Sequence, residues 1–390
     1  MIRVINTERI PIKMWLTDLE AGALEQAKNL ANLPFARSHI ALMPDCHQGF
    51  GMPIGGVIAL DNVIIPNAVG VDIGCGMCAV KTTLSHVSPP ALKAVMSAVR
   101  KVIPLGFKHH SKPQDDSYMP QQNVDLDRMP VVAREYEKAR YQLGTLGGGN
   151  HFIEIQKEEN GCIWIMIHSG SRNIGKQVAD HYNRIAIDLN KQWKSSVPGS
   201  AQLAWLPFDS PEGQSYVSEM QYCVDFAFAN RKLMMQRITE IFSEHFKEDF
   251  KGFPMINIAH NYASLEKHLG MELVVHRKGA TLAVEGTVGI IPGSQGTQSY
   301  IVKGKGNPQS FNSCSHGAGR IMGRKQAQRS LNLKEEIKKL EDKGIIHAVR
   351  TKRDLDEASG AYKDIDMVMK NQQDLVDILH ELKPLAVVKG

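Results

Sequence analysis

Residues Val69–Met77, with the sequence Val-Gly-Val-Asp-Ile-Gly-Cys-Gly-Met, place a carboxylate and a thiol in a glycine-rich turn after an apolar run. Because glycine adopts backbone conformations that other residues avoid, Asp72 and Cys75 can face the same point in space. Carboxylate and thiolate differ in hardness, and together they suit a borderline divalent metal. A single Asp-x-x-Cys turn is more often a tight turn with a buried free cysteine. The metal interpretation therefore depends on donors elsewhere in the chain.

Three histidines further along the chain supply such donors. His151 follows a run of glycines, and His168 and His260 each follow an apolar run of strand-like composition. Each histidine alone is more often a structural residue with satisfied hydrogen bonds than a ligand. With Asp72 and Cys75, however, they make five donors, enough for two ions that share the thiolate. Paired metals suit phosphate chemistry because they stabilise both the attacking and the leaving oxygen.

A second cluster, Ser313–Arg324, combines a histidine, several glycines and two arginines. We expect a loop that runs into a helix over 317–329, which would put Arg320 and Arg324 one turn apart on one face. Glycines let the backbone approach a phosphate, and a helix N-terminus and arginine forks both favour its charge. A neutral His316 beside that phosphate could attack phosphorus. The alternative is a solvated basic helix with a capping histidine.

Composition limits the classes of protein to consider. The 390 residues are 43% hydrophobic and 22% charged, as in ordinary globular proteins and unlike disordered chains. Six scattered cysteines suggest a reducing compartment, and no stretch resembles a signal peptide or a membrane span. We therefore expect a cytoplasmic protein without a membrane partner. The net charge of +5 permits a polyanionic partner but does not require one.

The order of apolar patterns predicts an α+β fold, because short strands cluster and helices do not alternate regularly with them. We expect a single large domain over residues 1–390, with a central cluster of strands and peripheral helices. The predicted strands cover residues 40–43, 57–60, 63–65, 152–155, 163–167, 256–258, 273–275, 288–291 and 300–302. The predicted helices cover 17–33, opened by a Thr17–Glu20 capping box, and 174–193, 215–246, 317–329, 333–341 and 365–382. A polar surface loop is predicted over 108–123.

Motifs spread along the whole chain resemble those of the RtcB family of RNA ligases. The motifs are long, they keep the order of the family, and they extend from one end of the chain to the other. The segments that carry it are Met43–Gly49, Val69–Met77, Leu143–Glu154, His168–Arg172, Ile290–Ser294, Ser315–Arg320, Tyr362–Asp366 and Val388–Gly390. The resemblance implies an RtcB-like fold. It also implies a GTP- and manganese-dependent ligase that joins an RNA 3′-phosphate or 2′,3′-cyclic phosphate to a 5′-hydroxyl end.

The resemblance also implies a role for individual residues. One manganese ion would be held by Asp72, Cys75 and His151, and the other by Cys75, His168 and His260. His316 would carry GMP, and Arg320 and Arg324 would hold RNA phosphate. The residues expected around the guanosine and its phosphate are Asn150, Phe152, Glu154, Ser294, Ser299, Ala318, Gly319, Tyr362 and Lys389. Asp45, from the first motif and at the end of the 40–43 strand, is expected as an additional active-site acid.

Two other functions remain open from the sequence. Gly149-Asn150-His151 is similar to the Gly-Asn-His turn of dinuclear metallophosphoesterases, so a nuclease acting on RNA is the main alternative. That alternative leaves His316 without a role. A non-enzymatic RNA-binding protein with a structural metal is the third, although structural sites usually close with four ligands rather than five. The sequence identifies neither the physiological RNA nor an activating protein partner.

Overall fold

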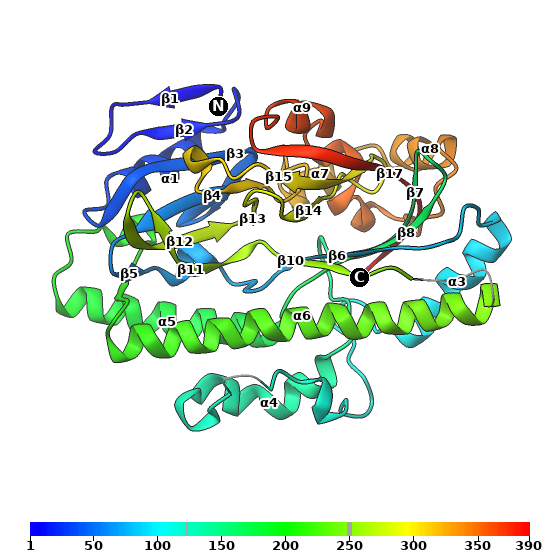
Figure 1. Cartoon of the computed structure of the whole chain (residues 1–390), viewed down its shortest axis with the longest axis horizontal. Coiled ribbons are helices and arrows are strands. Elements are labelled where there is room, and N and C mark those ends of the chain that lie inside the picture. The colour runs from blue at the N-terminus through cyan, green and yellow to red at the C-terminus, as the bar shows by residue number, and fades with distance from the viewer. Residues whose placement is uncertain (122–123, 248–251) are drawn as a thin grey trace.

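Two large β-sheets form the centre of the molecule in a computed structural model, which describes residues 1–121, 124–247 and 252–390 (Figure 1). The first sheet has the strand order β1-β2-β3-β4-β12-β11. Its strands are β1 Arg3–Ile5, β2 Ile12–Met14, β3 Ala36–Phe50, β4 Met52–Leu60, β12 Met271–Lys278 and β11 Asn261–His268. β2 and β3 are parallel, and the remaining neighbours are antiparallel.

The second sheet has the order β10-β6-β8-β7-β17-β15-β14, and all of its neighbours are antiparallel. Its strands are β10 Ile256–Ala259, β6 Gly76–Lys81, β8 Ile163–Ser169, β7 Phe152–Glu158, β17 Val376–Lys389, β15 Ser299–Gly304 and β14 Val288–Ile291. Two short pairs complete the strands: β5 Val63–Ile64 with β9 Leu206–Pro207, and β13 Ala280–Leu282 with β16 Ser313–Ser315. Segments that are distant in sequence therefore become neighbours in these sheets.

Helices surround the sheets, and α5 and α6 run side by side along one face with α4 outside them (Figure 1). The helices are α1 Ala21–Ala31, α2 Pro66–Val69, α3 Pro89–Val102, α4 Pro130–Gln142, α5 Arg172–Gln192, α6 Pro211–Phe246, α7 Arg324–Ser330, α8 Leu333–Asp342 and α9 Ile365–Lys370. Short 3₁₀ turns cover Asp116–Tyr118, Leu126–Arg128, Gly199–Ala201, Pro308–Ser310, Lys352–Glu357 and Ser359–Ala361. Within the described ranges, no helix combines the length and apolar character needed to cross a membrane.

The long helix α6 fixes the strand ends through two buried polar side chains. Arg231 donates from Nη1 to the carbonyls of Gly74 (3.0 Å) and Ser169 (2.8 Å), and from Nε to Asn257 Oδ1 (2.7 Å). The neighbouring Asn230 accepts from the backbone amide of Gly144 at 2.7 Å. Since buried polar groups are costly unless hydrogen-bonded, these contacts define where the turns before β6 and after β8 lie.

Gly76 allows an unusually close approach of β6 to β10. It pairs with Ala259, and a Cβ atom on it would lie 1.9 Å from the carbonyl oxygen of Ile258. The amide of His260 donates to the carbonyl of Cys75 at 2.9 Å. The glycine therefore brings the Asp72–Cys75 turn against the end of β10.

The predicted α+β class, with strands at the centre and helices outside, is confirmed. The helices predicted over 174–193 and 215–246 are also confirmed as α5 and α6, although α6 begins earlier, at Pro211. The predicted 108–123 loop contains the 3₁₀ turn Asp116–Tyr118, and its last residues, 122 and 123, lie outside the described residues. The prediction of one domain over residues 1–390 stays a prediction.

The helix predicted over 317–329 is wrong in its first half, because α7 begins only at Arg324. The preceding segment is irregular, and Arg320 forms a β-bridge with Tyr362. Gly319 has a φ of +74°, and a Cβ atom on it would lie 2.2 Å from the carbonyl oxygen of Asp45. Gly319 thus serves close packing against β3, and the two arginines do not share a helical face.

Other boundaries also differ from the predictions. The helix predicted over 365–382 ends at Lys370, and most of its second half belongs to strand β17. Helix α1 begins at Ala21 without the predicted capping box, because the carboxylate of Glu20 accepts instead from the amide of Gln48. The strand predicted over 40–43 is part of the 15-residue β3, so Asp45 lies inside that strand, where its pairing with β4 shifts register.

Candidate active site

Cys75, His151 and His168 form a buried cluster at the ends of three adjacent strands of the second sheet. The Sγ atom of Cys75 lies 3.2 Å from Nε2 of His168 and 3.5 Å from Nε2 of His151. One ligand atom from each of the three residues lies within 4.8 Å of the other two. A thiol and two imidazoles this close can all bind one borderline metal ion.

The remaining ring nitrogens of the two histidines are held by backbone carbonyls. Nδ1 of His151 donates to Leu146 at 3.0 Å, and Nδ1 of His168 donates to Asn150 at 3.1 Å. These bonds place the proton on Nδ1 and leave the lone pair of Nε2 facing Cys75. Outer hydrogen bonds of this kind orient metal-binding histidines in proteins.

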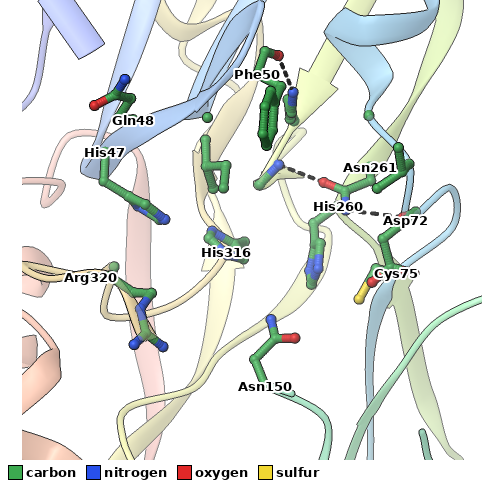
Figure 2. Close-up of a pocket in the computed structure, with 18 of the residues that line it drawn as sticks. His47, Gln48, Phe50, Asp72, Cys75, Asn150, His260, Asn261, His316 and Arg320 are labelled. Atoms are coloured by element: carbon green, nitrogen blue, oxygen red, sulfur yellow. Dashed lines mark hydrogen bonds between the residues drawn. The ribbon is translucent and has the colours of Figure 1, made fainter. Parts of the chain in front are cut away.

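Asp72 and His260, the other two donors expected from the sequence, lie beside Cys75 (Figure 2). Oδ2 of Asp72 lies 3.4 Å from Nε2 of His151, and the ring centroids of His168 and His260 are 5.2 Å apart. Nδ1 of His260 is buried, and it finds no hydrogen-bond partner in the described part of the chain. An orphaned lone pair in a buried site fits a residue whose partner is a metal ion.

The electrostatics of this cluster also fit a cation. Burial, followed by the charges of neighbouring histidines, keeps the pKa of His168 and that of His260 well below the usual value, so both imidazoles are neutral. Burial and the negative charge of Asp72 raise the pKa of the Cys75 thiol well above its usual value. A metal ion must therefore displace the thiol proton, and neutral imidazole is the form that ligates. The donors present fit a divalent metal.

His316 lies next to this cluster and is held by a buried carboxylate. Its Nδ1 donates to Oδ2 of Asp45 at 2.6 Å, and the same oxygen accepts from the amides of His316 (3.1 Å) and Gly317 (3.3 Å). Burial raises the pKa of Asp45, but its neighbours His316, Lys363 and His47 together outweigh burial and leave the pKa lowered. An ionised Asp45 therefore fixes Nδ1 as the protonated nitrogen, and Nε2 is free to act as a nucleophile.

His316 also contacts the metal-binding side of the site. Its ring centroid is 4.8 Å from that of His260, which in turn packs on His168. All three side chains line one cleft of about 1950 Å³. The nucleophile candidate and the metal-type donors thus share one cleft (Figure 2).

The residues expected around the guanosine gather at another part of the same cleft, where β7 pairs with β17. Phe152 pairs with Lys389, whose Nζ lies 5.7 Å from the centre of the phenyl ring. Burial raises the pKa of Glu154 to about 7, although a hydrogen bond from Gln156 and the charge of Lys389 act in the opposite direction. Asn150, Ser294, Ala318, Gly319 and Tyr362 line this cleft as well. Ser299 instead lies behind it and accepts from Gln156 at 3.0 Å.

The two arginines point toward a buried carboxylate that the sequence analysis did not single out. Nη1 of Arg320 lies 2.9 Å from Oε2 of Glu357, and Nε of Arg324 lies 2.8 Å from Oε1. The Tyr362 hydroxyl also donates to this carboxylate, and the guanidinium of Arg320 lies 5.1 Å from the Tyr362 ring centre. Glu357 therefore holds both guanidinium groups at the cleft. The sequence carried no separate signal for it.

The structure adds two cleft residues to those given a role above, His47 and Lys278, and places Arg172 behind the cleft residue His151. His47 lines the cleft, and its Nδ1 donates to the carbonyl of Asp45 at 3.0 Å. Its place in the first motif, two residues after Asp45, was the available signal. Arg172 donates to Thr145 Oγ1 at 3.1 Å and lies behind His151. Lys278 is buried at the cleft, whereas the preceding Arg277 pairs with Glu266 away from the site.

Comparison with known proteins gives a consistent answer. A sequence profile described as tRNA-splicing ligase RtcB matches residues 26–390. The chain is 38% identical to the RNA-splicing ligase RtcB of Escherichia coli K12, over 99% of each chain. It is 33% identical to the tRNA-splicing ligase RtcB of Thermococcus kodakarensis, over 94% of this chain and 91% of the relative. For the tRNA-splicing ligase RtcB of Nanoarchaeum equitans the identity is 32%, over 98% and 95%. With its metal-type donors, its buried His316–Asp45 pair and these relatives, the chain belongs to the RtcB family.

Proposed function

We propose that this protein is an RNA ligase that joins an RNA 3′-phosphate or 2′,3′-cyclic phosphate end to a 5′-hydroxyl end, with GTP and manganese. The observation that carries the proposal is the geometry of His316. Its Nδ1 is bound to buried Asp45 at 2.6 Å, its Nε2 makes no hydrogen bond to the described residues, and the metal-type donors lie beside it. A dinuclear phosphoesterase needs no such nucleophile, and no relative reported above is named as one.

In the proposed first step, Nε2 of His316 attacks the α-phosphorus of GTP. The N–P bond forms while the bond from the α-phosphorus to its bridging oxygen breaks, so pyrophosphate leaves. Asp45 keeps the proton on Nδ1 and stabilises the positive charge that develops on the ring, as expected for a carboxylate behind a reacting imidazole. The product is GMP bound to His316.

In the later steps, an RNA 3′-phosphate oxygen attacks the phosphorus of the His316 adduct, and Nε2 leaves. The RNA then carries a 3′-diphosphate linked to guanosine, which has a good leaving group. The 5′-hydroxyl oxygen of the second RNA attacks the 3′-phosphorus, its proton is lost, and GMP is released. A 2′,3′-cyclic end must first be opened by water to give the 3′-phosphate. Two covalent steps divide one difficult displacement into easier ones.

The donor set supports a divalent metal as the cofactor, and manganese is the ion that the family resemblance implies. Asp72, Cys75 and His151 would hold one ion, and Cys75, His168 and His260 would hold the other, because these donors surround the same thiol. When bound, such ions polarise phosphate oxygens and stabilise charge on attacking and leaving oxygens. The neutral state of His168 and His260 is already the state that such ligation needs.

Guanine selection would come from Glu154 and Lys389, which lie on the paired strands β7 and β17, with the charge of Lys389 acting on the carboxylate of Glu154. A carboxylate accepts from the N1 and N2 donors of guanine, a pattern that adenine lacks. Arg320 and Arg324 would hold RNA phosphate, in exchange for part of their contact with Glu357. We place this activity in the cytoplasm and propose broken or spliced RNA as its partner.

The test is intact-mass measurement after incubation with GTP and Mn²⁺, followed by peptide mapping. We expect a gain of one GMP on His316, labile to acid and stable to alkali, and no gain in His316→Ala. That variant should still bind RNA but should not join ends. A GMP group on a lysine, full sealing by His316→Ala, or net cleavage of end-defined RNA would contradict the proposal.

A further inference from the structure

We propose that Phe50 and Lys278 form a nucleotide subsite at the rim of the cleft, which binds the last nucleotide of the RNA strand that carries the 3′-phosphate. The Phe50 ring would stack on the base, and the Lys278 ammonium would bind the phosphate on the 5′ side of that nucleotide. This inference rests on the ligase activity proposed above and adds a binding site for one of its two RNA strands.

Lys278 is a buried amine whose pKa is lowered to about 7 by burial, and its protonated form has one hydrogen-bond donor to spare. Its side chain is only 8% exposed at the end of β12, where it lines the cleft. Nζ donates to the carbonyls of Phe50 (2.6 Å) and Asn67 (2.9 Å), which use two of the three ammonium donors. Across the described ranges it makes no ion pair with a carboxylate. Burying an uncompensated charge is costly, so an anion entering the cleft would complete this site.

Phe50 presents a flat apolar ring from a rigid backbone. Its side chain is 74% exposed at the tip of the β3–β4 hairpin, and it lines the same cleft. Lys278 holds its carbonyl, and the neighbouring amides of Gly49 and Gly51 donate to Gln26 (3.0 Å) and Gln202 (3.2 Å). An exposed aromatic ring on a fixed support, beside a cation, is the arrangement on which single-stranded bases stack.

The position of this subsite relative to His316 indicates which of the two RNA strands it binds. Figure 2 shows Phe50 and Asn150 on opposite sides of His316, and Asn150 leads directly into β7, which carries Glu154. Gly279 follows Lys278, and a Cβ atom on it would lie 3.1 Å from Cε1 of His316. If guanosine occupies the β7 side, the RNA that accepts GMP must extend from the nucleophile in the other direction. That direction leads to Lys278 and Phe50.

The test separates the two RNA strands. A 3′-phosphorylated oligoribonucleotide is titrated in a guanylylation assay without any 5′-hydroxyl strand, for the wild type, Phe50→Ala and Phe50→Tyr. We expect the KM for this RNA to rise about 10-fold in Phe50→Ala, with little change in kcat, and to be restored in Phe50→Tyr. Leu265→Ala, which removes an apolar side chain that is 51% exposed outside the cleft, should leave KM unchanged.

Lys278→Gln tests the cation, because glutamine can still donate to the two carbonyls without a charge. Fluorescence anisotropy with the same RNA should show weaker binding, and the dependence of log affinity on log salt should become shallower by about 0.7. A purely structural lysine would leave that slope unchanged. RNA-free guanylylation of His316 checks that each variant is folded.

Two results would overturn the subsite: an unchanged KM for the 3′-phosphate strand in Phe50→Ala, or a defect seen only when the 5′-hydroxyl strand is varied. Failure of the proposed ligase activity looks different, because the wild type would then form no GMP adduct at all. In that case the anisotropy measurement still tests the subsite directly.

Discussion

At the scale of single residues, the carboxyl group of Glu154 titrates close to neutral pH. Burial raises its pKa to about 7 from an ordinary value of 4.5. The hydrogen bond from Gln156 and the charge of Lys389 lower the pKa, but their effect is smaller. Only the ionised form accepts from both guanine donors, so the preference for GTP over ATP should increase as the pH rises through 7. The same shift means that this group favours folding below pH 4.5, and that its contribution is lost as the pH rises toward 7.

We therefore predict that Glu154→Gln lowers the ratio of GTP to ATP affinity about 10- to 100-fold above pH 8, and makes that ratio independent of pH. Nucleotide titrations between pH 6 and 8.5 measure this ratio, in which pH effects shared by both nucleotides cancel. The stability of the variant should also decline less than that of the wild type between pH 4.5 and 7. An unchanged GTP preference in Glu154→Gln would remove this residue from guanine recognition.

Residue types and local motifs were enough to predict much of the site. The five expected metal donors and His316 all lie in one cleft. They could be singled out in the sequence because each stands beside glycines or at the end of an apolar run. Glu357 could not be predicted in the same way, since its role depends on two arginines more than thirty positions away in the chain. The sequence left open whether Lys278 belongs to a solvated charged turn or to a nucleic-acid groove, because only the tertiary fold buries it.

At the scale of elements, the close pairing of β6 with β10 brings Cys75 and His260 into one site. We predict that Gly76→Ala destabilises the protein by about 1–3 kcal/mol, because its Cβ atom would lie 1.9 Å from the backbone oxygen of Ile258. The strands must separate, so metal affinity should fall as well. Denaturant unfolding and metal titration measure the two effects.

Gly199→Ala provides the matched control, since a Cβ atom there meets nothing within 4 Å. Its stability should stay within about 0.5 kcal/mol of the wild type. If Gly76→Ala were as stable as this control and bound metal normally, the close strand pairing would not be needed to form the site.

The elements that were predicted wrongly share a physical cause. The 365–382 segment has enough apolar residues for a helix, but from Val376 it pairs with β15 and at Leu382 also with β7, and such long-range pairing leaves no local signal. The glycines of 317–323 suggested a phosphate-binding helix start, yet the segment is irregular and Gly319 serves close contact with β3. Long periodic helices such as α5 and α6 were predictable because their apolar faces are encoded locally.

At the scale of the whole molecule, the site joins segments from most of the chain. The metal-type donors come from the turn before β6, the start of β7, the end of β8 and the end of β10, and Lys389 comes from β17. A metal ion bound there stabilises all of these strands together, since it binds only the folded arrangement. We therefore expect residues 1–390 to unfold as one domain whose stability depends on the metal.

Thermal unfolding should show a single transition, which Mn²⁺ shifts to higher temperature. An Mn²⁺ concentration 100-fold above the dissociation constant should add about 2.7 kcal/mol for each site. Cys75→Ala should lose most of this gain and all ligase activity, because its thiolate lies against both His151 and His168 and is shared by the two proposed ions. Cys162→Ala, which changes a cysteine outside the cleft, should keep the full gain. Two separate transitions would contradict the single domain, and intact two-ion binding in Cys75→Ala would rule out a shared thiolate.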